Sequence, residues 1–332
     1  SNGLKVYFKS MPGAPRVALY LSVFGGNRIE SVPGQSDIID SLLTQGTSRK
    51  NAETIALEID TIPMDFSIST HKDTTTVSAV MLPEDLEKAV SLMTECLFDS
   101  TLNDWTKEKL KLHGELTMQL DSPSSLAKDL LHNALYKGTS YQASAHNILA
   151  NLDNINSQDL LTSQYKKVYH PSNMMLVVVG DIAVEKLVAL LNQYFPKTSI
   201  ADTMENAGST QAQLITSNQY VTANRDDSQQ LHLYQGWLAP LYGTDEYYAM
   251  SVMNNVLGGA GLSSRLFTEI RDKQGLAYNV RSMFETSKYM TSFLIYIGTQ
   301  PHNREKVLKG FQVECDKLMN VALTPDELAA SK

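Results

Sequence analysis

The chain has 332 residues, of which 42% are hydrophobic and 19% are charged. This length suits about two domains of ordinary size, and the composition is typical of a globular protein with sizeable cores. The net charge of −8 argues against a general nucleic-acid or anionic-membrane surface. No apolar run approaches the roughly 20 residues that a membrane-spanning helix requires. The two cysteines, Cys96 and Cys315, are too few for a disulfide framework or a zinc ribbon.

The first part of the chain alternates between strand and helix patterns. β-branched content and alternation predict strands at residues 17–24, 65–70, 75–82 and 173–179. Apolar residues at helical spacing predict helices at residues 36–44, 52–60, 83–97, 106–120, 124–136, 157–169 and 184–194. Residues 198–211 are small and polar, which is typical of a linker between domains.

The second part repeats the first. Strand patterns at 230–237, 278–284 and 291–297 and helix patterns at 247–257 and 304–318 recur in the same order as their counterparts before residue 100. We therefore predict two homologous α+β domains, residues 1–197 and 212–332, joined by a linker at 198–211. Each should be an antiparallel-rich mixed sheet with helices on one face. The second copy stops at Lys332, so we expect it to be C-terminally incomplete by about 80–90 residues.

Five segments carry a family resemblance: residues 2–4, 34–47, 169–173, 178–181 and 262–280. The most specific is the run SRLFTEIRDKQGLAY at residues 264–278. Together they resemble the pitrilysin/insulinase family of zinc metallopeptidases, which includes mitochondrial processing peptidase and bacterial homologues. The resemblance covers nearly the whole chain and implies two metallohydrolase-like domains.

The zinc motif of that family is altered in this chain. Active members carry H-x-x-E-H on a helix, where two histidines one turn apart bind zinc and the glutamate activates water. Asp37 and Ser41 stand at the histidine positions, Asp40 stands at the glutamate position, and Glu115 matches a more distant ligand. With both imidazoles replaced, we expect no zinc in this chain. Oxygen ligands alone suit at most a weak site for a hard cation, and we prefer a structural helix N-terminus in which Asp37 favours the dipole.

The resemblance also singles out Arg271 and Tyr278. In the family, the domain or subunit without zinc supplies an arginine and a tyrosine at this spacing, facing the zinc of the other. This implies that Arg271 holds substrate and that Tyr278 donates its hydroxyl to the developing oxyanion. The spacing by itself favours a surface arginine and a half-buried strand tyrosine, and the surrounding family pattern reverses that preference. Gly258, Gly259 and Gly261 form either a flexible turn or a loop that contacts substrate, as in the zinc-free processing-peptidase subunit.

These features predict a non-catalytic, substrate-binding subunit of a heterodimeric zinc metalloendopeptidase, with zinc in the partner subunit and a peptide as substrate. In isolation the chain could pair with itself. Two alternatives remain open: a purely structural assembly subunit of the core-protein type, and a peptide-binding protein that adds segments to an exposed sheet edge. The resemblance points to a bacterial chain, in the periplasm or the cytoplasm, from which a leader could have been trimmed.

Overall fold

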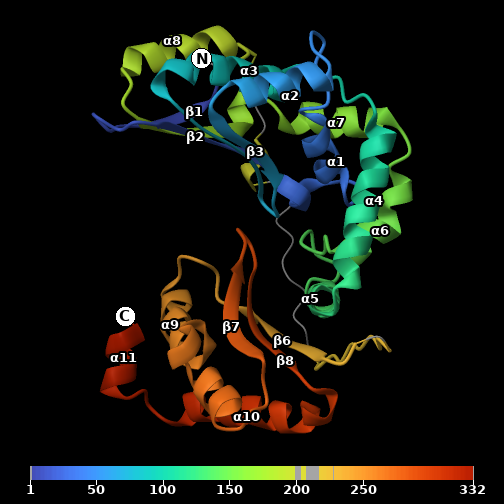
Figure 1. Ribbon diagram of the computed structural model, residues 1–332, viewed down its shortest axis with the longest axis vertical. Coiled ribbons are helices and arrows are strands. Elements are labelled where there is room, and N and C mark those ends of the chain that lie inside the picture. Colours follow the sequence, from blue (N-terminus) through green and yellow to red (C-terminus); the bar gives the residue numbers. More distant parts are fainter. Residues whose placement is uncertain (1, 199–202, 207–216, 227, 332) are drawn as a thin grey trace. The chain divides into compact units, whose positions relative to one another are not determined.

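The computed structural model describes residues 2–198, 203–206, 217–226 and 228–331. Contacts divide the chain into two compact units, one of Ser1–Leu116 with His146–Ser209 and one of Thr117–Ala145 with Thr210–Lys332 (Figure 1). The expected linker at 198–211 lies largely outside the described residues. The division by contacts differs from the division expected along the chain in one segment, Thr117–Ala145, which belongs to the second unit.

The first unit contains a five-stranded mixed sheet in the order β1-β5-β2-β4-β3. Its inner residues alternate with outer ones: Val17, Leu19 and Leu21 are at most 1% exposed, whereas Tyr20 is 49% exposed. β5 runs parallel to β1 and antiparallel to β2, and β4 lies antiparallel between β2 and β3. The strands are β1 (Lys5–Ser10), β2 (Val17–Phe24), β3 (Met64–Thr70), β4 (Thr74–Met81) and β5 (Met174–Gly180).

Helices cover this sheet because their apolar residues recur at helical spacing. In α3, for example, Leu86, Val90, Met93 and Leu97 are all buried. Figure 1 shows α2, α3 and α8 along one face of the sheet. The helices are α1 (Gln35–Leu42), α2 (Ala52–Thr61), α3 (Leu86–Phe98), α4 (Trp105–Asp121), α6 (Ala145–Asn151), α7 (Gln158–Val168) and α8 (Val184–Tyr194). Of these, only α6 was not predicted from the sequence.

The second unit repeats the inner part of the first sheet, as predicted. Its strands β6 (Leu231–Ala239), β7 (Asn279–Thr286) and β8 (Thr291–Thr299) lie in the order β6-β8-β7. β8 is antiparallel to both neighbours, as β4 is to β2 and β3. One face packs against α9 (Asp245–Asn254) and α10 (Arg304–Asn320), with Val307 and Phe311 of α10 among the most buried residues. A short α11 (Pro325–Ser331) follows.

The opposite face of this sheet is partly covered by α5 (Pro123–Leu135), a helix from the first half of the chain. Leu131, Leu135 and Tyr136 pack against residues of β6, β7 and β8, and the Tyr136 hydroxyl lies 2.7 Å from Ser292 Oγ. Every residue of β8 is buried, so both faces of this strand need cover. Helices therefore lie on both faces here, rather than on one face as expected.

The outer edge of β6 is open among the described residues of the second unit. In the first unit, β5 occupies the matching edge of β2, and β1 pairs only with β5. Residues 217–226, which precede β6 in the way that β1 precedes β2, form no strand. The reason is that a counterpart of β1 has no backbone to pair with unless a counterpart of β5 is present.

Residues 255–272 contain irregular turns in place of a regular α-helix. They include a 3₁₀ turn, η7 (Gly261–Ser263), and a π-helical turn, η8 (Phe267–Asp272), and another π turn, η6 (Asn255–Gly259), precedes them. In η8 the Lys273 amide donates to the Thr268 carbonyl, five residues earlier. Such wide turns are frequent at functional sites, and they are not visible in hydrophobic periodicity.

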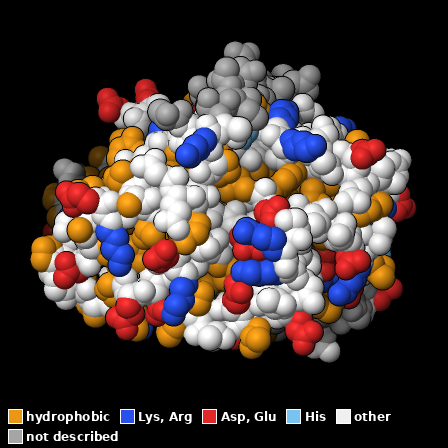
Figure 2. All heavy atoms as spheres, turned by 90° about the horizontal axis from the view of Figure 1, so that it is seen from above, with side chains coloured by type: hydrophobic (Ala, Val, Ile, Leu, Met, Phe, Trp, Pro, Cys, Tyr) orange, Lys and Arg blue, Asp and Glu red, His pale blue; other side chains and the backbone are white. Residues whose placement is uncertain are grey.

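Acidic and basic side chains are intermingled over the face shown in Figure 2, with apolar side chains scattered between them. Across the described residues, no helix has both the length and the apolar character needed to cross a membrane.

Candidate functional site

Helix α1 presents the altered zinc motif. Gly34 caps the helix with φ of 93°, a conformation that favours glycine. Ile38 and Ile39 on the inner side are at most 1% exposed and hold the helix in the core. Asp37, Asp40 and Ser41 are only partly exposed, so the structure brings these three predicted positions together on one short helix.

A carboxylate that the sequence analysis missed, Glu30, joins this site. Its Oε1 accepts from the Ser36 amide at 2.7 Å and its Oε2 accepts from the Gly34 amide at 2.9 Å. The Asn27 side-chain amide donates to both Glu30 Oε1 and Asp37 Oδ2, at 3.1 Å each. Glu30 thus caps the start of α1. An acidic residue shortly ahead of a glycine-led helix was a capping signal in the sequence.

The pKa values of these carboxyl groups are raised. Burial is the main cause and raises the pKa of Glu30 to about 8 and that of Asp40 to about 7. Burial also raises the pKa of Asp37, whose charge adds to the effect on both neighbours. The Tyr169 hydroxyl donates to Asp40 Oδ1 at 3.1 Å and lowers the Asp40 pKa, but burial prevails. The site therefore retains protons near neutral pH.

Glu115, the predicted distant ligand, lies on α4 with a side chain that is 58% exposed. Its Oε1 lies 4.0 Å from Lys111 Nζ, one turn earlier on the same helix. Within the part of the chain that the structure describes, no group of three or more histidine, cysteine, aspartate and glutamate residues is arranged to hold a metal ion. Glu115 thus does not join Asp37 and Asp40 in such a group.

Arg271 lies in the π turn η8. Its guanidinium carbon is 4.3 Å from the centre of the Phe267 ring, which fixes the side chain by a cation–π contact. The turn closes through hydrogen bonds from the Gly275 amide to the Arg271 carbonyl at 2.9 Å and from the Leu276 amide to the Ile270 carbonyl at 3.1 Å. This turn leads directly into β7.

Tyr278 stands just ahead of β7 and is 60% exposed. Its amide donates to the Gly298 carbonyl at 3.0 Å, which anchors the backbone to the central strand β8. Its hydroxyl has one long contact, with Gln300 Nε2 at 3.4 Å, a weak hydrogen bond at most. The backbone of Tyr278 is therefore fixed, while its hydroxyl is accessible to another molecule.

The glycine segment has a packing role that the sequence did not reveal. A Cβ at Gly258 would lie 2.4 Å from the Ser282 amide nitrogen of β7, and one at Gly259 would lie 2.6 Å from Asn254 Nδ2. Gly261 differs, because a Cβ there would meet nothing within 4 Å and its φ is +62°. Close packing of η6 against β7 accounts for Gly258, and Gly261 is the member with open space around it.

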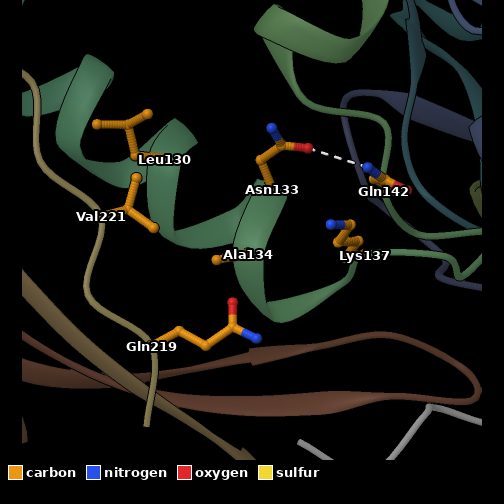
Figure 3. A pocket seen from close by; sticks show the side chains of 7 residues that line it. All are labelled: Leu130, Asn133, Ala134, Lys137, Gln142, Gln219 and Val221. Atoms are coloured by element: carbon orange, nitrogen blue, oxygen red, sulfur yellow. Dashed lines mark hydrogen bonds between the residues drawn. The ribbon is translucent and has the colours of Figure 1, made fainter.

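Two hollows occur in the second unit. One of about 210 Å³ lies between α5 and the extended chain at Gln219 and Val221. Figure 3 shows its lining, where Gln142 donates to Asn133 Oδ1 at 3.0 Å. Another of about 310 Å³ lies beside Ile270 and α10. Neither lining includes Arg271 or Tyr278. Tyr278 is exposed, whereas Arg271 is half-buried.

Comparisons with known proteins agree with this arrangement. Residues 5–147 match the model of the insulinase family, peptidase family M16, and residues 154–332 match the model of the peptidase M16 inactive domain. Relatives include the uncharacterized zinc protease YmxG of Bacillus subtilis, 28% identical over all of this chain and 80% of its own length. An uncharacterized zinc protease of Streptomyces coelicolor is 27% identical over 98% of this chain and 72% of its own length.

Solved structures share the fold. A peptidase M16 inactive domain from Pseudomonas fluorescens superposes with a TM-score of 0.86 at 24% identity, covering all of this chain and 80% of that one. A protease from Helicobacter pylori gives a TM-score of 0.89 at 19% identity, covering 99% and 81%. A chain of complex III2 from Candida albicans gives 0.79 at 14% identity, covering 99% and 78%. The altered motif on α1, the Arg271 turn and both family models lead to one conclusion: the chain belongs to peptidase family M16.

Proposed function

We propose that this chain is the zinc-free, substrate-binding subunit of a two-chain M16 endopeptidase whose partner subunit holds the zinc. The observation that carries the proposal is the state of the motif on α1. Asp37 and Asp40 accept hydrogen bonds from Asn27 and Tyr169 of the same unit. Burial raises the pKa values of these carboxyl groups and of Glu30, and the helix offers no imidazole nitrogen at the two positions where zinc would need one.

The second unit supplies the groups that would act on a peptide. When bound in the partner, zinc supplies a Lewis acid and an activated water. The accessible Tyr278 hydroxyl would donate to the oxygen of the scissile carbonyl as negative charge develops on it. Arg271, with its orientation fixed by Phe267, would hold a peptide carbonyl or carboxylate through paired donors. Of the glycine segment, Gly261 is the position at which substrate could approach the backbone.

The experiment is reconstitution. This chain would be mixed with a zinc-bearing M16 chain of the same organism and assayed on quenched-fluorescence peptides. We expect cleavage by the pair and none by this chain alone. Removing zinc from the partner with 1,10-phenanthroline should abolish the activity, whereas the same treatment of this chain followed by dialysis should not change it.

Substitutions in the reconstituted pair test the residue roles. Tyr278→Phe should lower kcat by about 10- to 100-fold with little change in KM, because the hydroxyl acts on charge that exists only in the transition state. Arg271→Ala should also raise KM. Tyr242→Phe is the matched control, since Tyr242 is another tyrosine of the second unit and is 67% exposed.

The second candidate is a structural assembly subunit, favoured by the fold shared with a chain of complex III2. It predicts that the pair assembles, by gel filtration, and that Tyr278→Phe and Arg271→Ala both match the wild-type chain. That result would remove our proposal and support the structural role. If Tyr278→Phe alone lowers kcat with assembly intact, the structural role is excluded.

A further inference from the structure

α5 contacts only half of the sheet face that it packs against. Directly opposed residues in antiparallel strands share a face, so the register defines rows across β6, β8 and β7. α5 contacts two rows through Leu131, Leu135 and Tyr136. The two rows toward the start of β7 are not among these contacts. They are His232–Gly298–Asn279, called the glycine row, and Tyr234–Tyr296–Arg281, called the arginine row.

The arginine row is an ordered cluster. The rings of Tyr234 and Tyr296 are 4.7 Å apart, and the Arg281 guanidinium carbon lies 5.6 Å from the centre of the Tyr296 ring. His232 Nδ1 lies 3.0 Å from the Tyr296 hydroxyl. Tyr296 is only 7% exposed, whereas Arg281 is exposed. Aromatic contacts therefore orient an arginine whose donors remain accessible to a ligand.

Arg281 has no acidic counterpart on this face. The one carboxylate in the four rows, Glu285, is bound by Lys128 at 2.7 Å and His132 at 2.6 Å, both from α5. Hydrogen bonds and electrostatic interactions with His132 and Lys128 lower the pKa of Glu285 to about 2, against the effect of burial, which raises it. Among the described residues, no carboxylate forms an ion pair with Arg281. Burial lowers the pKa of His232, so Arg281 is the charged side chain of the glycine and arginine rows at neutral pH.

The glycine row adjoins this charge and links it to Tyr278. A Cβ at Gly298 would lie 3.3 Å from the Tyr296 hydroxyl, so a larger residue would crowd that hydroxyl. The Gly298 carbonyl also accepts the Tyr278 amide at 3.0 Å. Arg281 follows Tyr278 by three residues along the chain, which is about 10 Å at the rise of a β-strand.

We propose that the arginine row is a subsite for a carboxylate of an extended peptide, held by Arg281 and flanked by Tyr234 and Tyr296. An extended peptide advances by about 3.3 Å per residue. The subsite would therefore select aspartate or glutamate at one position within a few residues of the bond that Tyr278 faces. The position relative to the cleaved bond rests on the proposed function, whereas binding of the carboxylate does not.

The chemistry favours a single carboxylate over a polyanion. Recognition of phosphate groups and nucleic acids uses clusters of arginine and lysine, but the arginine row contains one cation and the chain has a net charge of −8. A guanidinium offers two parallel donors to one carboxylate. Peptides with one acidic residue match this arrangement in charge and in number.

Cleavage profiling of the reconstituted pair is the first test. Peptides of random sequence would be digested and the cleaved bonds read by mass spectrometry. We expect acidic residues to be enriched by about 5- to 10-fold at one position within a few residues of the cleaved bond. A desolvated ion pair that contributes about 1–1.4 kcal/mol gives an enrichment of this size. Arg281→Gln should abolish this enrichment, and Arg281→Glu should replace it with enrichment of lysine and arginine. Arg304→Gln, at an arginine of α10 paired with Glu305, should leave the profile unchanged.

Direct binding separates this proposal from the proposed function. Fluorescence anisotropy with this chain alone would compare labelled, C-terminally amidated peptides that differ by one Glu→Gln change. The wild-type chain should favour the glutamate peptide, and Arg281→Gln should remove the preference even if no pair cleaves. Peptides with a free C-terminus would show whether a terminal carboxylate serves equally well. If the cleavage profile and the binding preference for the glutamate peptide are both unchanged in Arg281→Glu, the proposed subsite is wrong.

Discussion

At the scale of single residues, the altered zinc motif is a proton-binding cluster. Glu30 bonds to the backbone at the start of α1, and the Asn27 amide links it to Asp37. The three acids cannot all ionise at low cost so close together in a partly buried site. These hydrogen bonds form a network that serves the fold of the first unit.

This cluster predicts how stability depends on pH. The folded pKa of Glu30, about 8, is above its ordinary value of 4.5, and that of Asp40, about 7, is above 3.8. The folded state therefore holds protons that the unfolded state releases, and stability should fall as pH rises from about 4.5 to about 8. Glu30→Gln should flatten this slope. Relative to pH 5, the variant should lose less of its free energy of unfolding at pH 8 than the wild-type chain does, by on the order of 2–4 kcal/mol.

Urea unfolding at several pH values measures this effect. Trp105 of α4 and Trp237 of β6 are the only tryptophans, so a Trp237→Phe background makes fluorescence report on the first unit. Glu115→Gln is the control, because that side chain is 58% exposed and should keep the wild-type slope. An unchanged slope in Glu30→Gln would show that the cluster does not bind the protons assigned to it.

At the scale of elements, the two π turns determine the approach to Tyr278. η6 packs so closely on β7 that Gly258 lies against the Ser282 backbone, and η8 presents Arg271 ahead of the turn into β7. Each wide turn places one more residue in a helical turn than an α-helix does. Arg271 and Tyr278 therefore owe their placement to packing between short irregular turns and a strand.

Gly258→Ala should destabilise the second unit by about 1–3 kcal/mol, because the added methyl overlaps the backbone of β7. Gly114→Ala is the counterpart on α4. A Cβ there meets nothing within 4 Å, so this change should stabilise the helix by up to about 1 kcal/mol. Thermal unfolding of both variants measures these two changes in stability, which should have opposite signs. A neutral Gly258→Ala would instead favour the sequence-based interpretation of this segment as a flexible turn.

At the scale of the whole molecule, the order of the chain and the division into units differ. α5 lies in the first half of the sequence, but it packs on the sheet of the second unit. Leu135 is 5% exposed and Tyr136 is 1% exposed, and each such buried side chain contributes about 1.5–3 kcal/mol. The second unit thus depends on a segment some hundred residues earlier in the chain.

Two fragments test this dependence. A fragment of residues 117–331 should unfold cooperatively, whereas residues 212–331 should melt at least about 10 °C lower, because the latter lacks several kcal/mol of burial by α5. Near-ultraviolet circular dichroism of Trp237 would follow both transitions, and binding of the dye ANS would report the apolar face left bare. Equal melting temperatures would show that α5 contributes nothing to the second unit.

Much of this fold and part of its site could be predicted from local sequence. Alternation in β2, β3 and β4 and its recurrence in β6, β7 and β8 indicated the repeated sheet, because the side-chain period of a strand depends only on neighbours along the chain. The altered motif at Asp37, Asp40 and Ser41 and the spacing of Arg271 and Tyr278 were also evident. The roles assigned to Arg271 and Tyr278 remain predictions.

Only the tertiary structure showed which sheet α5 covers, that Glu30 joins Asp37 and Asp40, and that Arg281 lies in a row with Tyr234 and Tyr296. An apolar helix face indicates that something must cover it, but not which of two similar sheets does so. Strand register likewise joins residues more than 40 positions apart, and no local pattern encodes that pairing. The sequence by itself determined most of the helices and strands and the absence of histidines from the motif on α1. Packing between segments that are distant along the chain decided which charged side chains lie together.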